Sequence, residues 1–395
     1  MECISGGAMI LRNLNMIDGG DPVDIHIDDG KIASVKVNPI PGTSNGPELN
    51  FEQALVFPGI INSHDHLDFN LFPQTGNQIY PNYTAWGKDI HTNNKAEIAE
   101  ILKIPFLLRS SWGVYKNLLC GVTTVINHGE RLRWGNDLIT IFEDTQCLHS
   151  VQFEKRWQIK LNNPVKARLP VVVHVGEGDD WAAYKEIDQL TNWNLLRKKL
   201  IGVHAVAMSE EQAKKFKAVV WCPQSNYFLL NKTSRINLLK NHTQILFGTD
   251  STLTSRWNIW EHLVQARETR LLNDKALYDT LNRNAASAWK LNSGEISPGK
   301  DADIVVAKIK HGKTGLHSFF GISPADLLMV IHRGNIRLFD ETVLPQLKSI
   351  GLDNFSKIYI NGTCKYVQGN LPRLMDEIRA YQPGINFPVN SVNPN

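Results

Sequence analysis

Short apolar runs alternate with longer segments of helical period through the middle of the chain, residues 57–291. Nearly continuous apolar runs are typical of strands that are buried on both faces of a parallel sheet. Strand followed by helix, repeated, indicates an α/β fold, and at this length a (β/α)8 barrel of the TIM type is the first candidate. The predicted strands are residues 59–62, 122–127, 148–153, 171–175, 200–204, 218–222 and 245–248.

Helical spacing predicts helices between these strands, at residues 95–119, 136–144, 181–190, 209–217 and 257–272. A regular barrel has eight strands, whereas the pattern reveals only seven. Residues 127–171 are too short for the further strands and helices that a regular barrel would place there. The sequence therefore predicts a distorted barrel, either short of one βα unit or with a unit that the pattern does not reveal.

Both ends of the chain show short alternating strands and tight turns instead. Asp29-Gly30 and Asn361-Gly362 each separate two apolar runs, which is a strong hairpin signal. The two ends are therefore expected to form one small β domain, residues 1–57 plus 292–395, beside a barrel of residues 58–291.

The charge of the chain is balanced, with 42 Lys and Arg against 39 Asp and Glu in 395 residues and a formal charge of +3. Without a basic block, neither nucleic acid nor a membrane surface is indicated as a partner. The five cysteines form no C-x-x-C pair, and the start of the chain lacks the pattern of a signal peptide. No uncharged apolar run reaches the ~20 residues of a membrane span. We therefore expect a cytoplasmic protein with a small-molecule partner.

Side chains that can bind a metal stand at the ends of four predicted strands. His64 and His66 follow the first strand, His174 and His204 end two others, and Asp250 follows the last. In a parallel barrel these strand ends meet at one mouth. Residues two apart on a strand point to the same face, so His64 and His66 can bind one centre. The set predicts a catalytic Zn²⁺ or Fe²⁺ site, against the alternative of strand-end histidines without a ligand.

Two residues are predicted to act beside that centre. Glu177 comes three positions after His174 and is predicted to be a general acid and base. The alternative for Glu177 is a solvated loop acid next to Asp179 and Asp180. A catalytic role is predicted for His204 from its place at a strand end, against the alternative of a core histidine bonded to backbone.

Several motifs together resemble the amidohydrolase superfamily. They are "FPGIINSHDHL" at residues 57–67, "CGVTTV" at 120–125, "VVVHVGE" at 171–177, "GVHAVAM" at 202–208, "WCPQSN" at 221–226, "LFGTDS" at 246–251 and "SPGKDADIVV" at 297–306. The H-x-x-E and C-P-x-S-N elements resemble its branch of chlorohydrolases and aminohydrolases, which includes guanine, S-adenosylhomocysteine and triazine-compound deaminases. The resemblance spans nearly the whole chain and implies a barrel beside one composite β-sandwich built from both chain ends.

The resemblance also implies residue roles. The implied ligands of a single Zn²⁺ or Fe²⁺ are His64, His66, His174 and Asp250. Glu177 is implied to be the proton shuttle, and His204 to orient or polarise the substrate. A mononuclear site is expected, because no lysine stands at a strand end where its carbamylated form could bridge a second metal.

Substrate contacts are predicted for four residues near the strand ends: Trp86, His128, Arg131 and Asn226. An aromatic ring such as that of Trp86 can stack on a planar heterocycle, although most of the ten tryptophans are expected to serve packing. His128 has the better claim because it directly follows a predicted strand.

The implied reaction is hydrolysis of a carbon–nitrogen bond other than a peptide bond, in the first place deamination of a small heterocyclic amine, with dehalogenation as the chlorohydrolase variant. Ring opening of a cyclic amide, similar to imidazolonepropionase, would use much the same ligands. A two-metal amidohydrolase would need a further bridging ligand. A decayed homologue serving as a scaffold would have no reason to retain the complete set of ligands and acid. Enzymes of this kind are often oligomers, so a homo-oligomer is a further expectation.

Overall fold

Eight parallel strands in two sheets form the centre of the molecule. The computed structural model describes residues 8–37, 39–40, 46–132, 135, 137–310, 314–347 and 351–393. One sheet has the order β12-β11-β10-β9-β8 and the other the order β5-β6-β7, and each pairing within them is parallel. The strands are β5 (Ile60–Asp65), β6 (Val122–Asn127), β7 (Thr140–Phe142), β8 (Gln146–Ser150), β9 (Val171–Val175), β10 (Leu200–His204), β11 (Ala218–Trp221) and β12 (Gln244–Phe247).

The two parallel sheets adjoin at the end of β12. The backbone N–H groups of Thr249 and Asp250 both donate to the carbonyl oxygen of His64 on β5, at 3.1 Å each. Among the described residues, no strand pairing joins β7 to β8. The predicted α/β class is therefore confirmed, while the ladder of strand hydrogen bonds is not continuous around a closed barrel.

The strand that the pattern missed is β7. It falls inside the helix predicted at residues 136–144, and that prediction is wrong; residue 136 itself lies outside the described residues. Two β-branched residues followed by Phe142 favour a strand, which pairs in parallel with β6. Only residues 143–145 separate β7 from β8, so this unit lacks its helix rather than its strand.

The helices confirm most predicted helices with shifted ends. The helix predicted at residues 95–119 is two helices, because Pro105 precedes the second and disfavours helical backbone before it. Ser209 and Gln212 form a capping box. The α-helices are α1 (Tyr83–Asn93), α2 (Lys95–Leu102), α3 (Phe106–Leu118), α4 (Trp157–Leu161), α5 (Trp181–Asn192), α6 (Glu210–Ala213), α7 (Pro223–Leu230), α8 (Ile236–Leu239), α9 (Ile259–Glu268), α10 (Asp274–Leu281), α11 (Arg283–Trp289), α12 (Gly315–Phe319) and α13 (Leu371–Tyr381). Among the described residues, none is long and apolar enough to cross a membrane.

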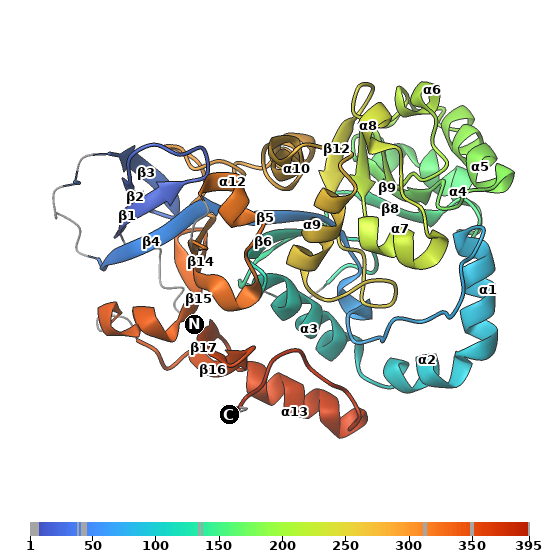
Figure 1. The fold of residues 1–395 in the computed structure, drawn as a ribbon. Helices are drawn as coiled ribbons and strands as arrows, with labels where there is room; N and C mark the ends of the chain where they lie inside the picture. Colours follow the sequence, from blue (N-terminus) through green and yellow to red (C-terminus); the bar gives the residue numbers. More distant parts are fainter. Residues whose placement is uncertain are drawn as a thin grey trace.

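Strands from both chain ends meet in a third sheet, of nine strands, on the other side of the molecule (Figure 1). Its order is β16-β17-β15-β14-β13-β4-β1-β2-β3, and antiparallel pairing of β4 with β13 joins the two ends. The predicted hairpin turns lie between β2 and β3 and between β16 and β17. The strands are β1 (Met9–Met16), β2 (Val23–Asp28), β3 (Lys31–Lys36), β4 (Glu48–Pro58), β13 (Ile304–Lys308), β14 (Leu327–His332), β15 (Asn335–Asp340), β16 (Phe355–Ile360) and β17 (Thr363–Gln368). A single sheet is observed here, so the two-layer sandwich stays a prediction.

Candidate metal-binding site

Three imidazoles and a carboxylate converge at the carboxyl ends of the parallel strands. Nε2 of His174 lies 3.1 Å from Nε2 of His64 and 3.3 Å from Nε2 of His66. Oδ1 of Asp250 lies 3.7 Å from Nε2 of His64 and 3.6 Å from Nε2 of His66. All four side chains are buried. The structure thus brings together the four residues predicted as ligands, which come from β5, β9 and the end of β12.

For His64, His174 and Asp250, the surroundings shift the pKa toward the state that a metal ligand needs. Burial lowers the pKa of His64 to about 4, and burial together with the neighbouring imidazoles lowers the pKa of His174 well below its usual range. Burial opposes ionisation of Asp250, but the hydrogen bond from His64 and the neighbouring imidazoles outweigh it and hold the pKa of Asp250 well below its usual value. Neutral imidazoles and an ionised carboxylate are the states in which these side chains bind a divalent metal. The donor set therefore fits Zn²⁺ or Fe²⁺.

The other oxygen of the Asp250 carboxylate is held by hydroxyl groups. Ser225 on α7 donates to Oδ2 at 2.7 Å, and Thr254 donates to it at 3.0 Å. Such partners fix the direction in which a carboxylate ligand points. The backbone of Asp250 itself is left-handed, with φ of 57°, which is uncommon for a residue other than glycine. Ser225 belongs to the "WCPQSN" motif, so that motif orients a predicted ligand.

Glu177 and His204 stand beside the predicted ligands. Nε2 of His204 lies 3.6 Å from Oε2 of Glu177 and 3.8 Å from Oδ2 of Asp250. The amide oxygen of Asn226 lies 2.9 Å from Nδ1 of His204, which therefore carries the proton and leaves Nε2 as an acceptor. Burial and the charge of Asp250 raise the pKa of Glu177 well above its usual value. A buried acid whose pKa is raised is suited to deliver a proton to a substrate.

The four predicted substrate contacts are placed differently. His128 lies within the group of imidazoles, with its ring centroid 5.0 Å from that of His64. Asn226 is turned to His204 instead of an open space. The guanidinium of Arg131 is exposed and donates to the carbonyl oxygen of Glu143 at 3.0 Å. The indole of Trp86 donates to the carbonyl oxygen of Thr75 at 2.8 Å. Of the four, only His128 is brought to the predicted ligands.

His149 was missed by the sequence reasoning although it lies in the same group. Its ring centroid is 5.1 Å from that of His174 and 6.4 Å from that of His128. His149 is exposed, whereas His128 and His174 are buried. It occupies the next-to-last position of β8, but the strand predicted at residues 148–153 places it at the start, so the rule of histidines at strand ends missed it. We call His64, His66, His128, His149, His174 and His204 the imidazole cluster.

A second missed residue, Glu186 on α5, supports the segment that carries Glu177. Its carboxylate accepts from the backbone N–H of Gly176 at 2.6 Å and from the hydroxyl of Tyr83 at 3.1 Å. Burial raises the pKa of Glu186 to about 7. In the sequence it resembles any polar residue of an amphipathic helix, and only the packing of α1 and α5 around it marks it out.

A network of polar side chains is centred on Asp65, the residue between His64 and His66. The carboxylate of Asp65 accepts from Nζ of Lys116 at 3.0 Å, from Asn117 at 2.7 Å and from Asn70 at 2.8 Å. The backbone N–H of Thr249 donates to the side chain of Asn62 at 3.1 Å. We call Asn62, Asp65, Asn70, Lys116, Asn117 and Thr249 the Asp65 network. It joins α3, β5 and the segment that leads to Asp250.

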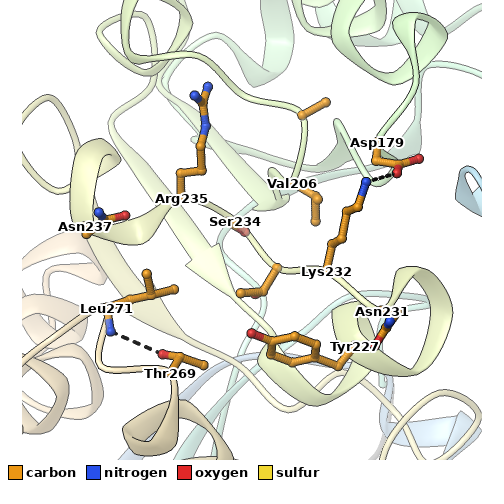
Figure 2. A pocket seen from close by; sticks show the side chains of 12 residues that line it. Asp179, Val206, Tyr227, Asn231, Lys232, Ser234, Arg235, Asn237, Thr269 and Leu271 are labelled. Carbon is orange, nitrogen blue, oxygen red and sulfur yellow. Dashed lines mark hydrogen bonds and ion pairs between the residues drawn. The ribbon is translucent and has the colours of Figure 1, made fainter.

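A cavity of about 530 Å³ lies elsewhere, beside α7 and α8. Figure 2 shows Tyr227, Arg235 and the ion pair of Lys232 with Asp179 along its wall. No predicted metal ligand is among its lining residues within the described part of the chain. Two of its lining residues contact groups around the site: the hydroxyl of Ser234 donates to the carbonyl oxygen of His204, and the hydroxyl of Thr233 accepts from the side-chain amide of Asn226. This cavity is therefore not the predicted substrate pocket.

Comparisons with known proteins agree with the resemblance seen in the motifs. The model of the amidohydrolase family matches residues 165–337. A 5′-deoxyadenosine deaminase of Methanococcus aeolicus is 22% identical over 353 residues, which cover 72% of this chain and 82% of the relative. A solved adenosine deaminase from Xanthomonas campestris with bound zinc has a TM-score of 0.73 at 14% identity, and the match covers 95% of this chain and 97% of that one.

A guanine deaminase from C. acetobutylicum, solved with guanine in its active site, has a TM-score of 0.65 at 16% identity, over 83% of this chain and 99% of that one. At such identities the likeness establishes the fold, a TIM-barrel-like α/β fold. The match to the family model and the curated relative confirm the predicted resemblance to the amidohydrolase family.

Proposed function

We propose that this chain, similar to the amidohydrolase family over residues 165–337, is a metal-dependent hydrolase of carbon–nitrogen bonds that deaminates a small heterocyclic amine. One observation carries the proposal: Nε2 of His64 and Nε2 of His66 each lie 3.1–3.3 Å from Nε2 of His174 and 3.6–3.7 Å from Oδ1 of Asp250. Glu177 and His204 stand at the edge of that group. The names of the relatives, which include deaminases of 5′-deoxyadenosine and guanine, support the substrate class.

The proposed ligands of one divalent cation are His64, His66, His174 and Asp250. A bound Zn²⁺ lowers the pKa of water from about 15.7 to about 7, which makes hydroxide accessible at neutral pH. Ser225 and Thr254 hold the far oxygen of Asp250 and so orient the carboxylate toward the centre.

Glu177 and His204 manage the protons in this proposal. Nδ1 of His204 donates to Asn226, which leaves Nε2 as an acceptor that orients the substrate, the role predicted for this residue. Glu177 accepts a proton from the attacking water and passes it to the substrate nitrogen. Its raised pKa suits it to hold that proton between the two steps. The water oxygen bonds to the carbon, the bond from that carbon to the amino group breaks, and ammonia and an oxo compound are formed.

The experiment is a screen of purine, pyrimidine and triazine amines with the zinc-loaded protein, read by ammonia release. Ammonia from one class of amine is the expected result. An acidic product without ammonia from a cyclic amide would instead assign ring opening. No turnover of either kind, despite bound zinc, would favour a scaffold homologue and overturn the proposal.

The predicted division into residues 1–57 plus 292–395 and residues 58–291 also stays a proposal. The pairing of β4 with β13, which joins the two chain ends in one sheet, supports it. A two-layer sandwich, assembly into a homo-oligomer and a place in the cytoplasm are predictions of the same standing. Trp86, Arg131 and Asn226 remain predicted substrate contacts.

A further inference from the structure

We propose that His128 is a fifth protein ligand of the divalent cation, so that the centre contains four imidazoles and one carboxylate. Two candidate metal-binding groups among the described residues share His64: one is His64, His128 and His174, and the other is His64, His66 and Asp250. Within each group, the ligand atoms all lie within 4.8 Å of one another. Nitrogens bound to one Zn²⁺ at about 2.0–2.1 Å lie about 3–4 Å apart. A small rotation of the ring would therefore bring the nitrogen of His128 to bonding distance from a cation held by His64 and His174.

The hydrogen-bonding state of His128 points to a ligand. Its side chain is 1% exposed, and neither Nδ1 nor Nε2 has a hydrogen-bond partner within the described residues. Buried polar groups in folded proteins are nearly always paired, and an unpaired one costs free energy. His204, equally buried, has Asn226 on Nδ1. A cation gives His128 the partner that the protein does not supply.

The backbone holds His128 in register with the other ligands. Its N–H donates to the carbonyl oxygen of Asp65 at 2.8 Å, between His64 and His66 on the neighbouring strand. The ring then lies stacked on that of His174, with centroids 4.4 Å apart and planes at 26°. The position of His128 is therefore set by β5 and β9, the same strands that carry the three other imidazoles.

Contact with the substrate is the rival role for His128, and metal affinity separates the two. The test compares the zinc affinity of His128→Asn and of the unmodified protein by competition with a chromophoric chelator. We expect affinity to fall by more than about 100-fold, because loss of a mere hydrogen-bond partner of a ligand already costs about 10–100-fold. His149→Asn is the matched control, since His149 lies in the same cluster but in neither of the two candidate metal-binding groups among the described residues. The loss of zinc affinity in His149→Asn is expected to be at least tenfold smaller than the loss in His128→Asn.

Zinc-edge X-ray absorption of the unmodified holoenzyme counts the imidazoles directly and needs no variant to fold. Four imidazoles, reduced to three in His128→Asn, are expected. Three imidazoles in the unmodified protein would overturn the proposal, as would a zinc affinity for His128→Asn within about threefold of the original. A raised KM together with unchanged zinc affinity would make His128 a substrate contact. None of the metal measurements requires turnover, so failure of the proposed deamination would leave the assignment of His128 intact.

Discussion

The imidazole cluster and the Asp65 network lie back to back on β5 and differ in how their polar groups are satisfied. Successive strand residues point to opposite sides, so Asp65 faces away from His64 and His66. Both oxygens of Asp65 accept hydrogen bonds, from Lys116, Asn117 and Asn70. In the cluster, Nδ1 of His64 and both ring nitrogens of His128 have no partner within the described residues. The first region is complete as folded, whereas the second is built to receive a ligand.

This difference indicates which variants should change the stability of the protein and which should change its metal binding. Lys116 and Asp65 are 1% and 0% exposed, and each charge depends on the other. A buried charge without its partner is strongly destabilising. An unpaired imidazole that is removed costs the metal-free fold little, because no hydrogen bond is lost. Variants in the Asp65 network should therefore lower the stability of the metal-free protein, whereas variants in the imidazole cluster should mainly lower zinc affinity.

Replacing a predicted ligand should cause the largest loss of zinc affinity. His174→Ala removes the nitrogen nearest to those of both His64 and His66, and zinc affinity should fall by more than about 100-fold, with loss of turnover. The metal-free protein should lose less stability than the about 3–5 kcal/mol expected for a buried charge without its partner, because only a buried neutral side chain is made smaller. Zinc content after dialysis and urea unfolding without metal check both statements. Retained zinc would exclude His174 as a ligand.

Replacing one member of the buried ion pair should give the reverse signature. Lys116→Met leaves the Asp65 carboxylate buried without its cation, and the metal-free protein should lose about 3–5 kcal/mol of stability. Urea unfolding measures the loss.

Lys116→Met combined with Asp65→Asn is the control for that loss. The double variant removes both charges, so it should recover most of the stability. A double variant no more stable than Lys116→Met would show that the charge pair is not what holds this side of β5 together.

The lowered pKa of an imidazole in the cluster should give a smaller effect, a dependence of protein stability on pH. The pKa of His64 is lowered by burial from 6.5 to about 4, so between these pH values the unfolded chain binds more protons than the folded one. Stability of the metal-free protein should therefore fall as the pH is lowered from about 6.5 to about 4, by up to about 3 kcal/mol from this group. His64→Asn should flatten that slope in urea unfolding across the range. An unchanged slope would contradict the lowered pKa of His64.

The sequence predicted the residues of the imidazole cluster better than those of the Asp65 network. His64, His66, His174 and Asp250 follow short apolar runs, and the rule that parallel strands end at one edge is enough to bring them together. Lys116 and Glu186 carry no such signal, because a polar residue of an amphipathic helix becomes buried only through the elements that pack over it. β7 was missed because three residues are too short to show a period. Local patterns therefore predicted which side chains converge, whereas only tertiary packing determines which residues support them.

The smallest effect is expected where a hydrogen bond supports a ligand from outside the cluster. Ser225→Ala removes the 2.7 Å bond to Oδ2 of Asp250, while the 3.0 Å bond from Thr254 remains, so zinc affinity should fall by about tenfold, the low end for such partners. Ser255→Ala is the matched control, since the Ser255 hydroxyl is also buried nearby but donates only to backbone carbonyl oxygens. Chelator competition on both variants distinguishes them. Equal zinc affinities would mean that the backbone alone orients Asp250. The hydroxyl of Ser225 would then make no contribution to zinc binding, and only the carboxylate itself would matter.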